Sequence, residues 1–141
     1  MRTFHIFKIK KDYTYLYENN SKILFDTLKY LYNIDKKEIK YGYNMFTQLT
    51  EKIDKNELNK SIYIKYHNKM IYSKNGNEHI INNLYKDEIS ILTIKSTYLL
   101  INVNHNYSSF FNILNNYGSN FFICDFNQND YFWINDIKTL V

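Results

Sequence analysis

The stretch EISILTIKSTYLLINVN, residues 88–104, decides the fold. Its two halves, Glu88–Lys95 and Thr97–Asn104, each alternate apolar with other side chains, which is the period of a strand with one buried face. Ser96 stands between the halves, so the pattern predicts an antiparallel hairpin. An isolated hairpin is marginally stable in water, and further strands or helices must therefore complete the sheet.

The opening segment supplies one partner strand. Arg2–Lys10 alternates so that its side chains fall into two groups, which predicts a strand partly covered on both faces. Phe121–Phe126 is an apolar run and predicts a buried strand. The two groups of the opening strand are Phe4, Ile6 and the aliphatic part of Lys8 on one side, and Thr3, His5, Phe7 and Ile9 on the other.

The middle of the chain carries weaker patterns. Ser61–Lys74 alternates around residues 67–70, which predicts another hairpin, and Asn75–Asn77 reads as a turn. His79–Tyr85 is interpreted as one helical turn. Asp35–Ile53 leaves two interpretations open, because Asp35 could cap a helix while Gly42 weakens it.

Three segments have helical spacing. A short helix over Asp12–Glu18 would be capped by its first residue. A second helix over Ser21–Asn33 has an apolar face on which Leu24, Leu28 and Leu31 recur at i, i+4 and i+7. A third would hold Phe110–Tyr117. With the strands, these helices predict an α+β fold, in which helices pack on the faces of a mixed, largely antiparallel sheet.

Length and composition narrow the class of protein. The chain has 141 residues, the size of one domain, and no linker-like stretch divides it, so residues 1–141 are expected to form a single domain. Its apolar runs are too short to span a bilayer. Cys124 is the single cysteine and cannot form an internal disulfide, so we expect a reduced, cytoplasmic protein. We also expect no cofactor and no metal, because glycines and histidines lack the spacing of a phosphate loop or a ligand set.

Two chemical alternatives stay open. Cys124 could be a nucleophile with His105 as its base, although a cysteine in an apolar strand is more often a buried core residue. A surface of Lys and Tyr could instead bind single-stranded nucleic acid. A net charge of +4 permits this, but AT-rich codons also favour both residue types. The adjacent Lys and Tyr pairs are Lys29-Tyr30, Lys40-Tyr41, Lys65-Tyr66 and Tyr85-Lys86.

The first helix carries the clearest candidate for protein binding. Tyr13 and Tyr17 are i, i+4 neighbours and project from one face, with Thr14 beside them and Tyr15 pointing away. Tyrosine is favoured at protein interfaces because it offers a large rigid area and a polar tip. The alternative is that both rings simply pack on the sheet.

The two ends of the chain resemble the SirA family, the sporulation inhibitors of replication of endospore-forming bacteria. The opening Phe4–Leu28, with IKKDY at residues 9–13 and the Ile23-Leu24-Phe25 helix, is similar to the N-terminus of the family. The closing Asp125-Phe126-Asn127, followed by Tyr131 and then Trp133-Ile134-Asn135, is similar to its C-terminal signature.

The resemblance implies a non-enzymatic regulator. SirA binds domain I of the replication initiator DnaA and blocks initiation when cells commit to sporulation. It implies that Tyr13, which stands where the family has Phe, contacts the initiator together with Thr14 and Tyr17. A second contact strip would fall at Thr47, Gln48 and Thr50. The family also implies a monomer that forms a 1:1 heterodimer with its partner.

Overall fold

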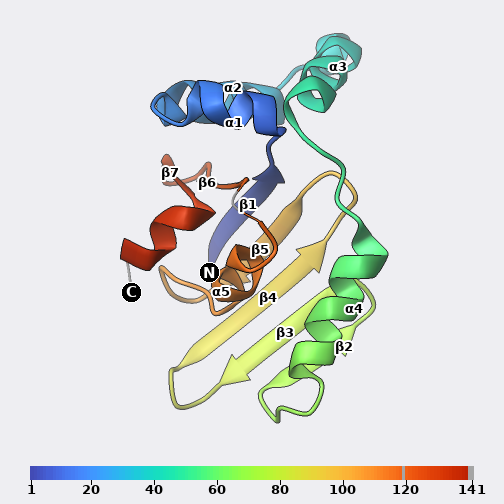
Figure 1. Cartoon of the computed structure of the whole chain (residues 1–141), viewed down its shortest axis with the longest axis vertical. Coiled ribbons are helices and arrows are strands. Elements are labelled where there is room, and N and C mark those ends of the chain that lie inside the picture. Colours follow the sequence, from blue (N-terminus) through green and yellow to red (C-terminus); the bar gives the residue numbers. More distant parts are fainter. Residues whose placement is uncertain (119, 140–141) are drawn as a thin grey trace.

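A single antiparallel sheet organises the chain. The computed structural model describes residues 1–118 and 120–139. In this part of the chain seven strands lie in the order β2-β3-β4-β5-β1-β6-β7, and every neighbouring pair is antiparallel (Figure 1). The strands are β1 (Arg2–Lys8), β2 (Tyr72–Asn75), β3 (Glu78–Asn83), β4 (Glu88–Ile94), β5 (Leu99–Val103), β6 (Phe121–Asp125) and β7 (Asp130–Trp133). The α+β fold class is confirmed.

The hairpin that the sequence predicts at residues 88–104 is β4 and β5. Ile94 pairs with Leu99 and Leu92 with Ile101, so their apolar side chains share one face. The opening strand, β1, then pairs with β5 on one side and β6 on the other. As predicted, its two faces are both covered, and successive residues such as Ile6 and Phe7 enter different cores.

Five α-helices and two short 3₁₀ turns accompany the sheet in the described residues. They are α1 (Lys11–Tyr17), α2 (Ser21–Tyr32), η1 (Lys36–Glu38), α3 (Ile39–Leu49), α4 (Lys55–Tyr66), α5 (Phe110–Asn115) and η2 (Ile134–Thr139). The three helices that the sequence predicts are confirmed as α1, α2 and α5. The first of them begins one residue before Asp12, which lies within its first turn instead of capping it. The ambiguous segment 35–53 folds as η1 and α3.

Two predictions for the middle of the chain are wrong. Residues 61–66, read as a strand, continue α4, which buries Leu58, Ile62 and Tyr66 at i, i+4 and i+8 on the sheet. The side chain of Asp54 accepts a hydrogen bond from the Glu57 backbone N–H and so caps that helix. Residues 79–83, read as a helical turn, belong to strand β3, which pairs with both β2 and β4.

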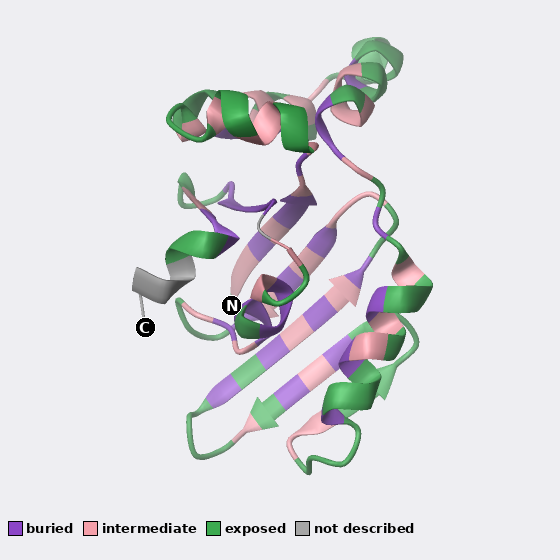
Figure 2. Cartoon of the chain, in the orientation of Figure 1, coloured by how far each residue is buried: buried purple, intermediate pink, exposed green. Residues whose placement is uncertain are grey.

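The helices cover different parts of the two faces. One core lies between α4, α5 and the sheet, and includes Phe4 of β1 and Phe111 of α5. A second core lies on the opposite face around β1, β6 and β7, where Leu24, Phe25 and Leu28 of α2 pack. In Figure 2 the outer sides of α1, α2 and α3 are exposed, whereas β1 and β4 carry buried residues. These three helices therefore form one end of the molecule.

Candidate partner-binding surface

Helix α1 presents the candidate tyrosines at the margin of the second core. Tyr13 and Tyr17 are half-buried and pack against this core, so one side of each ring is held while the other stays accessible. Thr14 donates its hydroxyl to the Lys10 carbonyl at 3.2 Å. The prediction that Tyr13 and Tyr17 share a face is confirmed, as is the prediction that Tyr15, 82% exposed, points away from it. The two interpretations of these rings are therefore compatible, because each ring both packs and remains accessible.

The second predicted strip lies on α3 and directly after it. Thr47 is half-buried and donates its hydroxyl to the Asn44 carbonyl, whereas Gln48 is exposed. Thr50 is buried and donates its hydroxyl to the Phe46 carbonyl at 2.9 Å. Gln48 thus offers the most accessible side chain of this strip. Thr50 lies behind it and can affect a partner only through the position of the backbone.

Backbone hydrogen bonds bring the two strips together. The N–H of Lys10 donates to the carbonyl of Leu49 at 2.9 Å, and the N–H of Glu51 donates to the carbonyl of Lys8 at 2.7 Å. An isolated β-bridge joins Ile9 to Thr50 between these two bonds. The end of α3 is therefore tied to the segment that leads into α1, and the two predicted strips lie at the same end of the molecule (Figure 1).

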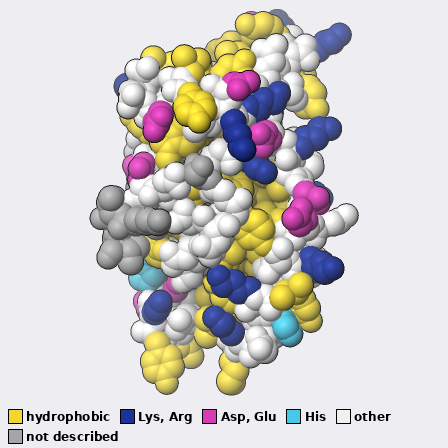
Figure 3. Space-filling view, viewed as in Figure 1, with side chains coloured by type: hydrophobic (Ala, Val, Ile, Leu, Met, Phe, Trp, Pro, Cys, Tyr) yellow, Lys and Arg dark blue, Asp and Glu magenta, His cyan; other side chains and the backbone are white. Residues whose placement is uncertain are grey.

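Exposed apolar side chains extend the same end of the molecule. Figure 3 shows hydrophobic side chains gathered over α1, α2 and α3. The sequence patterns do not group these residues as one exposed patch, because they stand outside the apolar stripes that bury each helix. What could have indicated them is an apolar residue at a helical position that lies outside the buried stripe. The exposed residues are Tyr15, Leu16, Ile23, Tyr30, Tyr32, Ile39, Tyr41 and Tyr43.

Trp133 of the C-terminal motif anchors the start of α2 to the sheet. The Trp133 ring packs 4.8 Å from Phe122, and its Nε1–H donates to the Ser21 hydroxyl at 3.0 Å. Because Ser21 opens α2, this bond fixes the start of that helix on the sheet. Trp133 is buried and so closes this part of the core.

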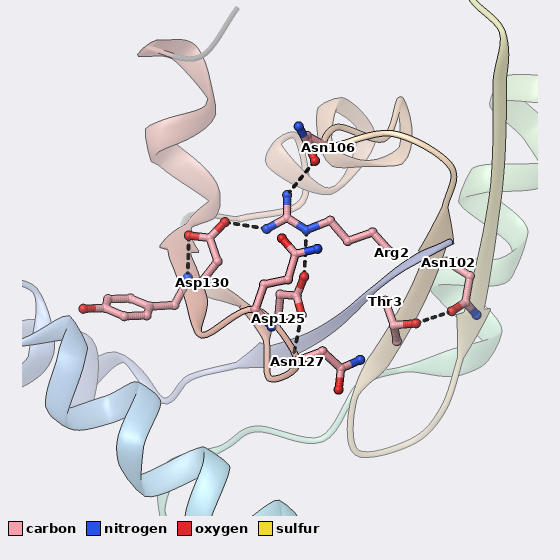
Figure 4. Close-up of polar contacts among 9 residues, drawn as sticks. Arg2, Thr3, Asn102, Asn106, Asp125, Asn127 and Asp130 are labelled. Atoms are coloured by element: carbon pink, nitrogen blue, oxygen red, sulfur yellow. Dashed lines mark hydrogen bonds and ion pairs between the residues drawn. The ribbon is translucent and has the colours of Figure 1, made fainter.

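Asp125 of the C-terminal motif shapes the turn that follows β6. Its Oδ1 accepts the backbone N–H groups of Asn127 and Gln128, both at 3.0 Å, and so shapes the turn into β7. Its Oδ2 lies 2.7 Å from Nε of Arg2, whose Nη2 lies 2.6 Å from Asp130 (Figure 4). Burial acts to lower the pKa of the Arg2 guanidinium, but the hydrogen bonds and charges of the two carboxylates raise it overall. The network clamps the first strand to the last hairpin.

Gly42 sets how closely α3 approaches the chain after α2. A Cβ atom at this position would lie 2.5 Å from Cδ1 of Ile34. Alanine is favoured over glycine in a helix by about 1 kcal/mol. In Gly42→Ala the clash with Ile34 would offset this gain in stability. We expect Gly42→Ala to stabilise the protein by about 1 kcal/mol only when Ile34→Val removes that Cδ1 atom, and to give little or no gain alone. Urea unfolding of the two single variants and the double variant measures this coupling; additive effects would contradict it.

The remaining reactive groups are committed inside the fold. Cys124 is fully buried, and burial raises the pKa of its thiol well above the ordinary value, which does not suit a nucleophile. His105 contacts the Asp87 carbonyl at 2.6 Å. The buried carboxylate of Glu88 accepts the N–H and hydroxyl of Ser109 at the start of α5. Burial or contacts within the fold therefore explain Cys124, His105 and Glu88 without a catalytic role.

Within residues 1–118 and 120–139, no three His, Cys, Asp or Glu side chains come together as a metal site. No helix in that part of the chain is both long and apolar enough to cross a membrane.

The Lys and Tyr pairs of the sequence lie on separate elements. They fall on α2, α3, α4 and the turn between β3 and β4, which occupy both ends of the molecule (Figure 1). Tyr66 is buried, and Tyr30 donates its hydroxyl to Glu38. A nucleic-acid groove needs accessible rings along one path, so this distribution gives it little support.

Comparison with known proteins gives one result. A family model described as "Sporulation inhibitor of replication protein SirA" matches residues 2–138, nearly the whole chain. No curated protein matches the chain significantly. The match covers both ends, where the sequence motifs lie, and also the middle, where they are absent.

Proposed function

The chain belongs to the SirA family of sporulation inhibitors of replication, and we propose that it inhibits replication initiation by binding domain I of the initiator DnaA. The inhibitor acts in the cytoplasm, as one folded domain, through a 1:1 complex and without catalysis. The observation that carries the proposal is the backbone pairing between the segment that leads into α1 and the end of α3; both belong to the proposed binding surface. Its contact residues are Tyr13, Thr14, Tyr17, Thr47 and Gln48, with Thr50 supporting them from behind.

The geometry suits recognition by surface burial. The rings of Tyr13 and Tyr17 are already held against the second core, so they lose little side-chain freedom when a partner covers them. The ion pair between Lys8 and Glu51, beside the backbone tie, is 3.6 Å long, and each side chain is about one-third exposed, so it is weakened by solvent. Binding anchored by aromatic rings should therefore depend only weakly on salt.

Truncation of the contact residues tests the surface. We expect Tyr17→Ala and Gln48→Ala to weaken binding to DnaA domain I, the tyrosine by about 1.5 kcal/mol or roughly ten-fold. Isothermal titration calorimetry with domain I from the same organism measures this. Tyr85→Ala is the matched control, since Tyr85 is fully exposed on the turn between β3 and β4. It should bind as the unaltered protein does.

Two further measurements separate the possible failures. Tyr17→Phe keeps the packing ring and removes only the hydroxyl, and circular dichroism shows whether Tyr17→Ala remains folded. If both contact variants are folded and bind normally, the assigned surface is wrong. If the unaltered protein gives no heat at tens of micromolar, the choice of partner is wrong. A complex that weakens steeply with salt would favour the nucleic-acid alternative in an assay with single-stranded DNA.

A further inference from the structure

A hollow of about 280 Å³ lies between α2, α3 and the turn that joins β4 to β5. Its walls include Phe7 of β1, Leu28 and Leu31 of α2, Tyr43 and Phe46 of α3, and Tyr98 of the turn. Its size is near the lower end of ordinary small-molecule sites, which run from ~300 to ~1,000 Å³. It is separate from the contact residues proposed above, although α3 contributes to both.

The hollow exists because α3 does not close onto the sheet. Gly42, Phe46 and Leu49 lie on the inner face of α3 at i, i+4 and i+7, but only Gly42 and Leu49 are buried. Phe46 stays half-buried and lines the hollow. Apolar side chains that face a hollow open to solvent keep apolar surface in contact with water. A molecule of the right shape would cover that surface.

The walls are aromatic and their rings are ordered by contact with one another. Phe7 meets Phe46 edge to face at 5.8 Å and lies 6.1 Å from Tyr98. His5 stacks on Tyr98 at 5.6 Å. Such an arrangement accepts a flat ring by stacking or by edge-to-face contact.

The electrostatics of the hollow favour an uncharged occupant. None of the described residues that line it is Asp, Glu, Lys or Arg. His5 supplies an imidazole, and its Nδ1 is buried without a hydrogen-bond partner. Burial and the charge of Lys95 lower the pKa of His5, so the ring is neutral near pH 7. A charged ligand would lose its hydration here, and the lining residues offer it no counter-charge; the ammonium of Lys95 lies outside the lining, 5.3 Å from the centroid of the Tyr98 ring.

We propose that this hollow binds a small, uncharged aromatic molecule of one or two rings, which packs among Phe7, Phe46 and Tyr98 and turns its one hydrogen-bonding group toward His5. The proposal needs no partner protein, so it stands or fails independently of initiator binding.

Titration with indole, followed by amide NMR shifts of the full chain, tests the site. We expect saturable shifts at Gly42, Phe46 and Tyr98 with a dissociation constant below about 1 mM. Leu31→Trp places an indole in the wall and should weaken binding by about ten-fold or more. Leu84→Trp makes the same exchange at an exposed site, on the turn between β3 and β4, and should leave binding unchanged.

Charge selectivity gives a second measurement on the unaltered protein. Benzyl alcohol should bind at least about ten-fold more tightly than benzoate or benzylammonium, because the three differ only in the group that must lose water. Equal binding of all three would overturn the proposal. So would shifts that do not saturate, that spread over exposed residues such as Tyr85, or that survive unchanged in folded Leu31→Trp.

Discussion

Replacing Asp125 with Ala is expected to lower the free energy of unfolding by about 3 kcal/mol, because it removes the buried acceptor of three hydrogen bonds, although Arg2 keeps its pair with the half-exposed Asp130. The Asp125 side chain is only 1% exposed and that of Arg2 12%. The substitution removes the bond to Arg2 and also the acceptor of two backbone N–H groups in the turn before β7. Urea unfolding monitored by circular dichroism measures the loss.

A surface ion pair on α2 provides the matched control. Lys22 and Asp26 lie 2.8 Å apart at i, i+4, but both side chains are largely exposed. Asp26→Ala should therefore change the stability little. Equal effects of Asp125→Ala and Asp26→Ala would show that the buried clamp contributes no more than an ordinary surface pair.

Acidification is expected to destabilise the protein through His79. This ring is fully buried, with the Tyr72 hydroxyl 2.7 Å from Nδ1 and Oδ1 of Asn59 2.7 Å from Nε2. A neutral ring with its proton on Nε2 satisfies both contacts, since Tyr72 then donates and Asn59 accepts. Burial, and to a lesser extent the charge of Lys74, lower the pKa of His79 to about 4.

The direction of the pH effect follows from the difference between the two states. In the unfolded chain a histidine has its ordinary pKa of about 6.5, so between about pH 6.5 and pH 4 the unfolded state binds more protons. The contribution is therefore complete above pH 6.5 and is lost as the pH falls toward 4. Allowing for partial solvent screening, the loss from about pH 7 to about pH 4.5 is about 2 kcal/mol. Burial also lowers the pKa of His5, which acts in the same direction.

Two variants isolate this contribution. His79→Gln removes the titrating ring and can keep a hydrogen bond, so the stability of this variant should fall less steeply between pH 7 and pH 4.5. His67→Gln, at an exposed position after α4, should retain the slope of the unaltered protein. Chemical unfolding at several pH values gives both slopes. Parallel slopes for His79→Gln and the unaltered protein would exclude His79 as the source.

Local patterns predicted the parts of the fold in which one face of an element is apolar. The hairpin at residues 88–104 and helix α2 have clear periods of that kind. The sequence pattern does not indicate helix α4, because only one side chain per turn of this helix is buried. In the segment SIYIKY, residues 61–66, the apolar Ile62, Ile64 and Tyr66 alternate as they would in a strand. In the helix, Ile64 is exposed although it is apolar, so the strand-like pattern is misleading. Only contact with the sheet distinguishes the two structures.

The sequence by itself determined that Tyr13 and Tyr17 share a helix face, because helical geometry relates residues four apart without any further contact. It also determined the strand alternation that divides the two cores. Only the tertiary structure brought the end of α3 to the start of α1, since the bond between Lys10 and Leu49 joins segments almost forty residues apart. The same holds for the hollow beneath α3, which depends on how far Gly42 and Ile34 let two helices approach. Spacing along a chain fixes direction within one element, whereas the distance between elements comes from packing.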